Sequence, residues 1–317
     1  MIKVTDLAYG RLSAPDLDLM EEFLSAFGMV RADRTDKALF MRGTDPDHTL
    51  HVTELGEPSF IGLAFHARTE EDLEIISKAD GASAIHELDE PGGMKRVTLT
   101  DPNGLQIEVV HGMKQLDTLD VRKITYNNGF ERYNRTGKLQ RVPMRPSHIK
   151  RSAHAVIKTP HVAESNAWYQ KHFGLVTTDT VYQGEEENLL AIFNHVDADE
   201  EFVDHHVFLC VAGETPGFNH LSFEVFDFDD VQAGHDHLKS QNKYKHVWGI
   251  GRHYLGSQIF DYWRDPWGRI HEHWTDSDMI NNNHEASVVP AEEGLSNQWG
   301  PEFPWEFLDD PEKHALK

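Results

Sequence analysis

His154, His220 and Glu272 are the side chains of this sequence that are best suited to chemistry. Two histidines and one carboxylate are the ligand set of mononuclear non-haem Fe(II) sites that keep open coordination positions. The three residues lie far apart in the sequence and form no local motif, and chance triplets are common in a chain with 21 histidines. An internal repeat is what links them.

The chain carries one sequence pattern twice, and the three candidate ligands occupy matched positions in the second copy. The first copy contains segments 8–11, 60–65 and 101–108, which are echoed by segments 153–156, 218–223 and 265–272. At the matched positions the first copy has Tyr9, Gly62 and Glu108. It keeps the carboxylate but lacks both histidines, so we expect metal binding in the second copy and none in the first.

The composition is that of a soluble protein of about two domains. The 317 residues carry a formal net charge of −23, which argues against nucleic acid and anionic membranes as partners, because phosphate binding needs clustered positive charge. Cys210 is the single cysteine of the chain, so no disulfide can form within it. We find neither a signal-peptide pattern nor an apolar stretch long enough to span a membrane, and therefore expect a cytoplasmic protein.

The repeat divides the chain into two modules, a connector and a tail. We predict an N-terminal non-catalytic module at 1–112, a surface connector at 113–148, a C-terminal catalytic metal-binding module at 149–275 and a tail at 276–317. The tail is acidic but carries aromatic residues, which is not typical of a solvated segment. We expect it to fold over the open side of the second module as a lid, or to lie in a subunit interface.

Each module is predicted to have a β-α-β-β-β order within an α+β fold. Apolar stripes and end signals predict helices at about 14–27, 69–78, 163–173 and 228–240. Two small curved sheets of this kind pair into a half-barrel around a cavity, and the metal site would lie in the half-barrel of the C-terminal module. Side chains alternate between the two faces of a strand, so Glu272 and its neighbours His271 and His273 cannot all face that cavity.

The segment that ends at Glu272 resembles a known signature. The residues are Gly251-Arg252-His253, then Tyr262, then Asp265-Pro266-Trp267-Gly268 and Glu272. Together they resemble the signature of the type I extradiol ring-cleavage dioxygenases, the catechol 2,3-dioxygenase-like enzymes of the vicinal oxygen chelate superfamily. The paired modules of that superfamily match the organisation predicted above, to about residue 275. Asp261 departs from the family pattern, which has an aliphatic or aromatic residue before the tyrosine.

The resemblance implies a metal and its ligands. It makes His154, His220 and Glu272 the ligands of Fe(II), with Mn(II) as the alternative ion, because both metals suit imidazole and carboxylate ligands. The implied activity is the O2-dependent opening of the ring of a small monocyclic catechol or trihydroxybenzene, next to its two adjacent metal-bound oxygens. The partners would be the aromatic diol and O2, and the family commonly forms homo-oligomers.

The resemblance also implies the residues that act on the substrate. His253 and Tyr262 would form hydrogen bonds with its oxygens. An acid–base histidine is implied directly after Asp204, where His205 and His206 compete. The family pattern of a histidine before a short apolar strand favours His205. For the walls of the substrate pocket we name Trp248, Tyr254 and Val156.

Three other functions are compatible with parts of this pattern. The first is ring cleavage of a hydroquinone-type diol. The second is an isomerase or lyase of the glyoxalase type, which usually draws metal ligands from both modules, whereas Tyr9 and Gly62 remove two of them here. The third is a non-enzymatic ligand binder, against which the full ligand triad argues.

Overall fold

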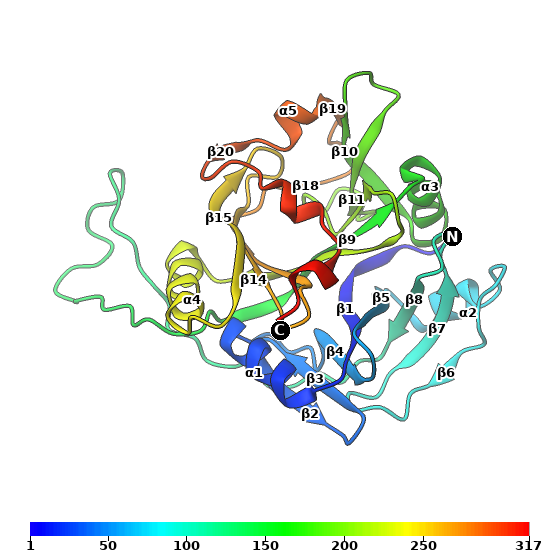
Figure 1. Ribbon diagram of the computed structural model, residues 1–317, viewed down its shortest axis with the longest axis horizontal. Coiled ribbons are helices and arrows are strands. Elements are labelled where there is room, and N and C mark those ends of the chain that lie inside the picture. The colour runs from blue at the N-terminus through cyan, green and yellow to red at the C-terminus, as the bar shows by residue number, and fades with distance from the viewer. Residues whose placement is uncertain (317) are drawn as a thin grey trace.

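The computed structural model describes residues 1–316 and contains two mixed β-sheets, one for each copy of the repeat (Figure 1). The first sheet has eight strands in the order β2-β3-β4-β1-β5-β8-β7-β6. The second has ten strands in the order β19-β10-β11-β13-β9-β14-β17-β16-β15-β20. This is the predicted α+β architecture of two paired modules. In the described part of the chain, no helix is long and apolar enough to cross a membrane.

The first sheet is formed entirely by residues before the connector. Its strands are β1 (Val4–Ala14), β2 (Val30–Arg34), β3 (Ala38–Arg42), β4 (His51–Leu55), β5 (Ser59–Ala67), β6 (His86–Glu87), β7 (Lys95–Thr100) and β8 (Gln106–His111). Two helices accompany it, α1 (Leu17–Phe27) and α2 (Glu70–Ile76).

The second sheet contains the strands that carry the candidate ligands. Its strands before the tail are β9 (Ile149–Thr159), β10 (Leu175–Tyr182), β11 (Leu189–Val196), β13 (Phe208–Ala212), β14 (Gly217–Val225), β15 (Lys245–His253), β16 (Ile259–Arg264) and β17 (Ile270–Thr275). The helices are α3 (Val162–Phe173) and α4 (Phe228–Ser240), and β12 (Val203–Asp204) pairs separately with the tail strand β18.

The two sheets repeat the same central topology, which explains the repeat in the sequence. In the first, β1 pairs parallel with β4 and antiparallel with β5, and β5 pairs parallel with β8. In the second, β9 has the same relations to β13 and β14, and β14 pairs parallel with β17. The matched positions of the repeat therefore lie at matched positions of the two sheets.

Both helices of the first module are shorter than predicted, and local hydrogen bonds set their starts. Helix α1 begins at Leu17 because the Asp16 carboxylate accepts the backbone N–H of Leu19 and caps the helix. Helix α2 begins after Thr69, which forms a capping box with Asp72.

The two modules are joined by buried polar and aromatic contacts. The ring of Phe27 stacks on that of His273, with centroids 3.8 Å apart, and the guanidinium of Arg269 donates to the backbone oxygens of Ser13 and Ser59. His273 lies 2.6 Å from the backbone oxygen of Phe27. His273 therefore serves the module contact and faces away from the cavity, as strand alternation requires.

The connector between β8 and β9 has an irregular backbone, and part of it projects from the body (Figure 1). Phe130, Tyr133 and Leu139 are exposed there. We expected a connector packed on the surface, and the structure differs because this stretch lacks the apolar periodicity that would anchor it.

The tail crosses the second module and extends its sheet at both edges. It contains β18 (Met279–Ile280), β19 (Ser287–Pro290), α5 (Ala291–Gly294), β20 (Asn297–Trp299) and the 3-10 helices η1 (Trp305–Leu308) and η2 (Pro311–His314). Strand β19 pairs with β10 and β20 pairs with β15, so the segment between them connects the two opposite edges of the second sheet (Figure 1).

Candidate active site

The three candidate ligands come together on adjacent central strands of the second sheet. His154 lies on β9, His220 on β14 and Glu272 on β17, and all three are buried. The Nε2 atom of His154 lies 3.2 Å from Nε2 of His220 and 3.0 Å from Oε2 of Glu272. The Nε2 atom of His220 lies 3.5 Å from the same oxygen. The three ligand atoms therefore converge on one point.

The donor set fits a divalent metal ion. Both carboxylate oxygens of Glu272 are buried without a hydrogen-bond partner among the described residues, an arrangement that is costly unless a cation satisfies them. Burial alone would raise the pKa of Glu272, but the neighbouring histidines, His154 first, hold that pKa well below its usual value. Burial lowers the pKa of His220 to about 3, so its ring is neutral and able to bind a metal.

A neighbouring side chain orients one of these ligands. The Nδ1 atom of His220 lies 2.6 Å from the amide oxygen of Asn219. An amide oxygen can only accept, so Nδ1 carries the proton and the Nε2 lone pair points at the metal position. Sequence reasoning missed Asn219, although its position directly before a ligand histidine was the available signal.

His253 and Tyr262 lie beside the ligand triad, as the resemblance implied. The Nε2 atom of His253 lies 2.9 Å from the hydroxyl of Tyr262 and 3.7 Å from Oε1 of Glu272. Burial and the nearby Glu272 carboxylate raise the pKa of Tyr262 well above its usual value, so its hydroxyl keeps its proton. Both side chains line the cavity and can form hydrogen bonds with a bound ligand.

The structure corrects the choice between the two adjacent histidines. His206 lines the cavity, with its ring centroid 4.2 Å from that of His154. His205 turns away, and its Nε2 atom lies 2.7 Å from a carboxylate oxygen of Asp179. The prediction of His205 rested on the family pattern of a histidine before a short apolar strand. The chain bends at residues 205–207, between β12 and β13, and this bend puts His206 on the cavity side instead.

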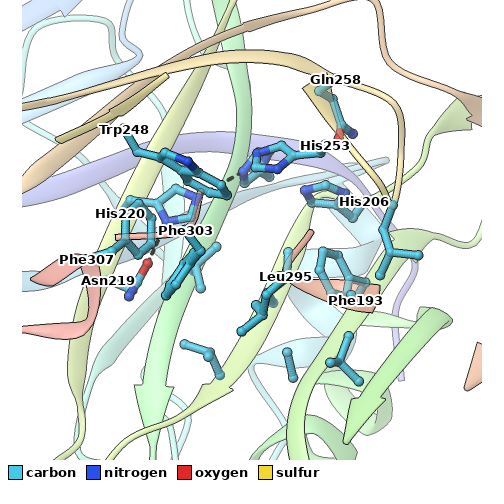
Figure 2. Close-up of a pocket in the computed structure, with 18 of the residues that line it drawn as sticks. Phe193, His206, Asn219, His220, Trp248, His253, Gln258, Leu295, Phe303 and Phe307 are labelled. Atoms are coloured by element: carbon cyan, nitrogen blue, oxygen red, sulfur yellow. Dashed lines mark hydrogen bonds between the residues drawn. The ribbon is translucent and has the colours of Figure 1, made fainter. Parts of the chain in front are cut away.

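The cavity beside the triad has mostly apolar walls (Figure 2). Val156 and Trp248 line it, as predicted. Tyr254 does not: its side chain is 42% exposed, and its hydroxyl donates to Glu293 on α5. Tyr254 follows the end of β15, where the chain turns outward into the loop before β16. Gln258, which sequence reasoning also missed, adds a polar group to the wall.

Residues of the tail close one side of this cavity. Figure 2 shows Phe303 and Phe307 near His220 and Trp248, and Leu295 farther along the cavity. The Phe307 ring meets that of Tyr262 edge-on, with centroids 5.0 Å apart. The tail therefore forms part of the wall of the site.

At the matched position of the first module, an arginine side chain lies where the second module has its candidate metal site. The buried Glu108 carboxylate accepts from the hydroxyl of Tyr9 at 2.5 Å and lies 3.0 Å from Nε of Arg11. Arg11 is itself buried and also pairs with Glu54 and Glu90. Its guanidinium supplies the positive charge that Glu108 needs in a buried setting.

Replacing Glu108 by Ala is expected to destabilise the protein by about 3 kcal/mol, because it leaves the buried Arg11 without one of its carboxylate partners. Urea unfolding would measure this, with the exposed Glu87→Ala as the control that changes stability by less than about 0.5 kcal/mol. Metal content per chain should be unchanged in both variants. A loss of metal on replacing Glu108 would show that the first module binds metal after all.

Comparisons with known proteins agree with this architecture. Residues 151–270 match the model of the Glyoxalase/Bleomycin resistance protein/Dioxygenase superfamily. Metapyrocatechase 2 of Cupriavidus necator is 29% identical over 306 residues, which cover 95% of this chain and 90% of that protein.

Two solved structures illustrate the fold. A Mn(II)-bound glyoxalase from Novosphingobium aromaticivorans superposes with a TM-score of 0.79 at 21% identity and covers 100% of this chain and 97% of its own. Homoprotocatechuate 2,3-dioxygenase from Brevibacterium fuscum, complexed with 3,4-dihydroxyphenylacetate, superposes with a TM-score of 0.77 at 18% identity, covering 100% and 93%. Residues 151–270 therefore match the Glyoxalase/Bleomycin resistance protein/Dioxygenase superfamily, and the chain as a whole has the two-module fold of these two solved structures.

Proposed function

We propose that this protein is a metal-dependent extradiol dioxygenase, which uses O2 to open the ring of a small catechol next to its two hydroxyl groups. The observation that carries this proposal is the convergence of two kinds of residue on one cavity. The ligand triad lies at its edge, and three residues suited to diol chemistry, His206, His253 and Tyr262, line its wall. The similarity to metapyrocatechase 2 over nearly the whole chain supports it.

Fe(II) is the metal that we propose for the triad, with Mn(II) as the alternative. Both ions suit imidazole and carboxylate ligands, and one structural relative is a Mn(II)-bound glyoxalase. When bound, such an ion acts as a Lewis acid that lowers the pKa of a coordinated hydroxyl and holds substrate and O2 together. Metal analysis of protein purified without oxygen would identify the ion.

The chain's own residues supply proton transfer and orientation. His206 is placed to accept a proton from a substrate hydroxyl and to return it later. His253 and Tyr262 form one hydrogen-bonded pair that can hold the substrate oxygens in place. The phenylalanines of the tail exclude water from the same space.

The wall residues favour an uncharged substrate. Of the described residues that line the cavity, none is Lys or Arg, and most are aliphatic or aromatic. A carboxylate on the ring would be buried there without a partner, at a cost of several kcal/mol. We therefore expect kcat/KM for catechol and methylcatechols to exceed that for 3,4-dihydroxyphenylacetate by at least about 100-fold. Equal kcat/KM values for the charged and uncharged diols would contradict this reading of the cavity.

The same assay separates the other functions. A hydroquinone-type enzyme would open para-diols and leave catechols intact. An isomerase of the glyoxalase type would consume no O2, and the substitution of both histidines in the first module argues against that reading. The homo-oligomeric state and the cytoplasmic location expected from the sequence stay predictions.

Replacing Phe307 by Ala is expected to raise KM for catechol about tenfold. The buried Phe307 ring contacts Tyr262 and His220, so its removal opens the cavity to water and removes a packing surface worth about 1–2 kcal/mol to a bound ring. Steady-state kinetics with O2 uptake would measure this. Trp305→Ala is the matched control, because Trp305 lies in the same 3-10 helix with 70% of its side chain exposed. Equal kinetics in the two variants would end the proposal that the tail acts as a lid.

A further inference from the structure

Behind the cavity histidine lies a chain of two more polar side chains. The Nδ1 atom of His206 lies 3.0 Å from Nδ1 of His205, and Nε2 of His205 lies 2.7 Å from Oδ2 of Asp179. All three residues are buried. The three side chains therefore form a line that starts at Asp179 on strand β10, passes through His205 and ends at His206 in the cavity wall.

The outer end of this chain is fixed by the fold. Asp179 lies on β10, where it pairs in register with Ser287 of β19, and the Ser287 hydroxyl donates to its other carboxylate oxygen. The backbone of His205 is held on both sides, because its N–H donates to the oxygen of Asp278 and its carbonyl accepts the hydroxyl of Thr178 at 2.8 Å. The chain is therefore positioned by strand β10 and by the tail together.

Asp179 is ionised and acts only as an acceptor. Burial alone would raise the pKa of Asp179, but its contacts with His205 and Ser287 hold that pKa below its usual value. An ionised carboxylate has no proton to donate. The proton between His205 and Asp179 must therefore be bound to Nε2 of His205.

For a neutral His205, this assignment determines the tautomers of both rings. A neutral His205 protonated on Nε2 has an unprotonated Nδ1, which can only accept. The proton between the two Nδ1 atoms then belongs to His206. A neutral His206 with its proton on Nδ1 keeps an unprotonated Nε2, the form of the ring that can accept a proton.

We propose that Asp179 and His205 are positioning residues that hold His206 as its Nδ1–H tautomer, so that its Nε2 lone pair is available to a hydroxyl of the substrate. The proton moves from the substrate oxygen to Nε2 of His206, while His205 keeps its proton on Nε2 and Asp179 stays ionised. The role of this tautomer in catalysis rests on the proposed function, whereas the tautomer itself is a property of the protein without substrate. A carboxylate that orients a histidine through its second nitrogen is a common arrangement around catalytic and metal-binding imidazoles.

The tautomer of His206 can be measured directly by 15N NMR of histidine-labelled protein loaded with diamagnetic Zn2+. The signal of His206 is identified by its disappearance in His206→Gln. In the wild type we expect a protonated Nδ1 and an unprotonated Nε2, and in Asp179→Asn we expect loss of this preference. An Nε2–H tautomer of His206 in the wild type would overturn the proposal, even if the Asp179 variant fails to fold.

Kinetics provide the second test. Asp179→Asn is expected to lower kcat for catechol about 10–100-fold, with KM and metal content close to wild type. In the His206→Gln background the same replacement should cause no further loss, because residues that act as a unit are not additive. An additive loss in the double variant would show that Asp179 acts independently of His206 and would contradict the proposal. If no diol is cleaved by the wild type, the proposed function fails while the NMR result still decides the tautomer.

Discussion

Replacing Glu272 by Ala is expected to abolish both metal binding and ring cleavage. The Glu272 carboxylate is the one anionic ligand of the triad and is buried without a hydrogen-bond partner among residues 1–316, so its loss leaves only the two imidazoles as ligands. Metal-ion catalysis contributes several kcal/mol, and we therefore expect activity to fall by at least about 10³-fold. Elemental analysis and O2 uptake with catechol would measure the two losses.

His154→Ala and His220→Ala should behave in the same way, because both rings share the ligand position with Glu272. Glu108→Gln is the matched control, since it changes the equivalent carboxylate of the first module and should retain one ion per chain. Stoichiometric metal in Glu272→Ala would place the ion elsewhere and contradict the assignment of the triad.

Replacing His206 by Gln is expected to lower kcat about 10²–10⁴-fold while metal content stays at the wild-type value, which is the usual range for the loss of a general acid–base group. His206 lines the cavity and touches the ligand His154 without belonging to the ligand set. Steady-state kinetics on metal-loaded protein would measure the change. Tyr254→Phe should be near wild type, because Tyr254 lies outside the cavity. Normal turnover by His206→Gln would rule out His206 as the acid–base residue.

The repeat allowed much of the architecture to be predicted from the sequence. Matched positions of the repeat predicted that residues as distant as His154, His220 and Glu272 would form one site, and the structure brings them together on adjacent strands. The cross-strand pair of Tyr262 with Glu272 explains why the family signature spans two strands and the turn between them.

Local irregularities of the backbone limited how well individual side chains could be placed from the sequence. Strand alternation predicts the direction of a side chain only within a regular strand. It therefore could not predict which of His205 and His206 faces the cavity, because the chain bends at residues 205–207. The aromatic character of Tyr254 suggested a pocket residue, but the outward turn after β15 decides its position. Arg11 has no counterpart in the second module, so the repeat gave no reason to expect a buried guanidinium beside Glu108.

Asp261 shows how a departure from a family pattern can be structural. It is fully buried and lies within 3.0 Å of ring nitrogens of His235 and His246, and it accepts from the indole of Trp263. These contacts join α4, β15 and β16 on the face of the sheet opposite to Tyr262. The residue before the tyrosine thus supports the strand that carries it.

The most direct test of the account is the reaction of Fe(II)-loaded protein with catechol, followed by O2 consumption and the mass and structure of the product. We expect one O2 to be consumed for each catechol, and a ring-opened product that contains both oxygen atoms and carries one aldehyde and one carboxylate group. Protein that binds one ion per chain at the triad and yet consumes no O2 with any uncharged catechol would contradict the proposed function, and a product with two carboxylates would show that the ring opens between the hydroxyl groups instead.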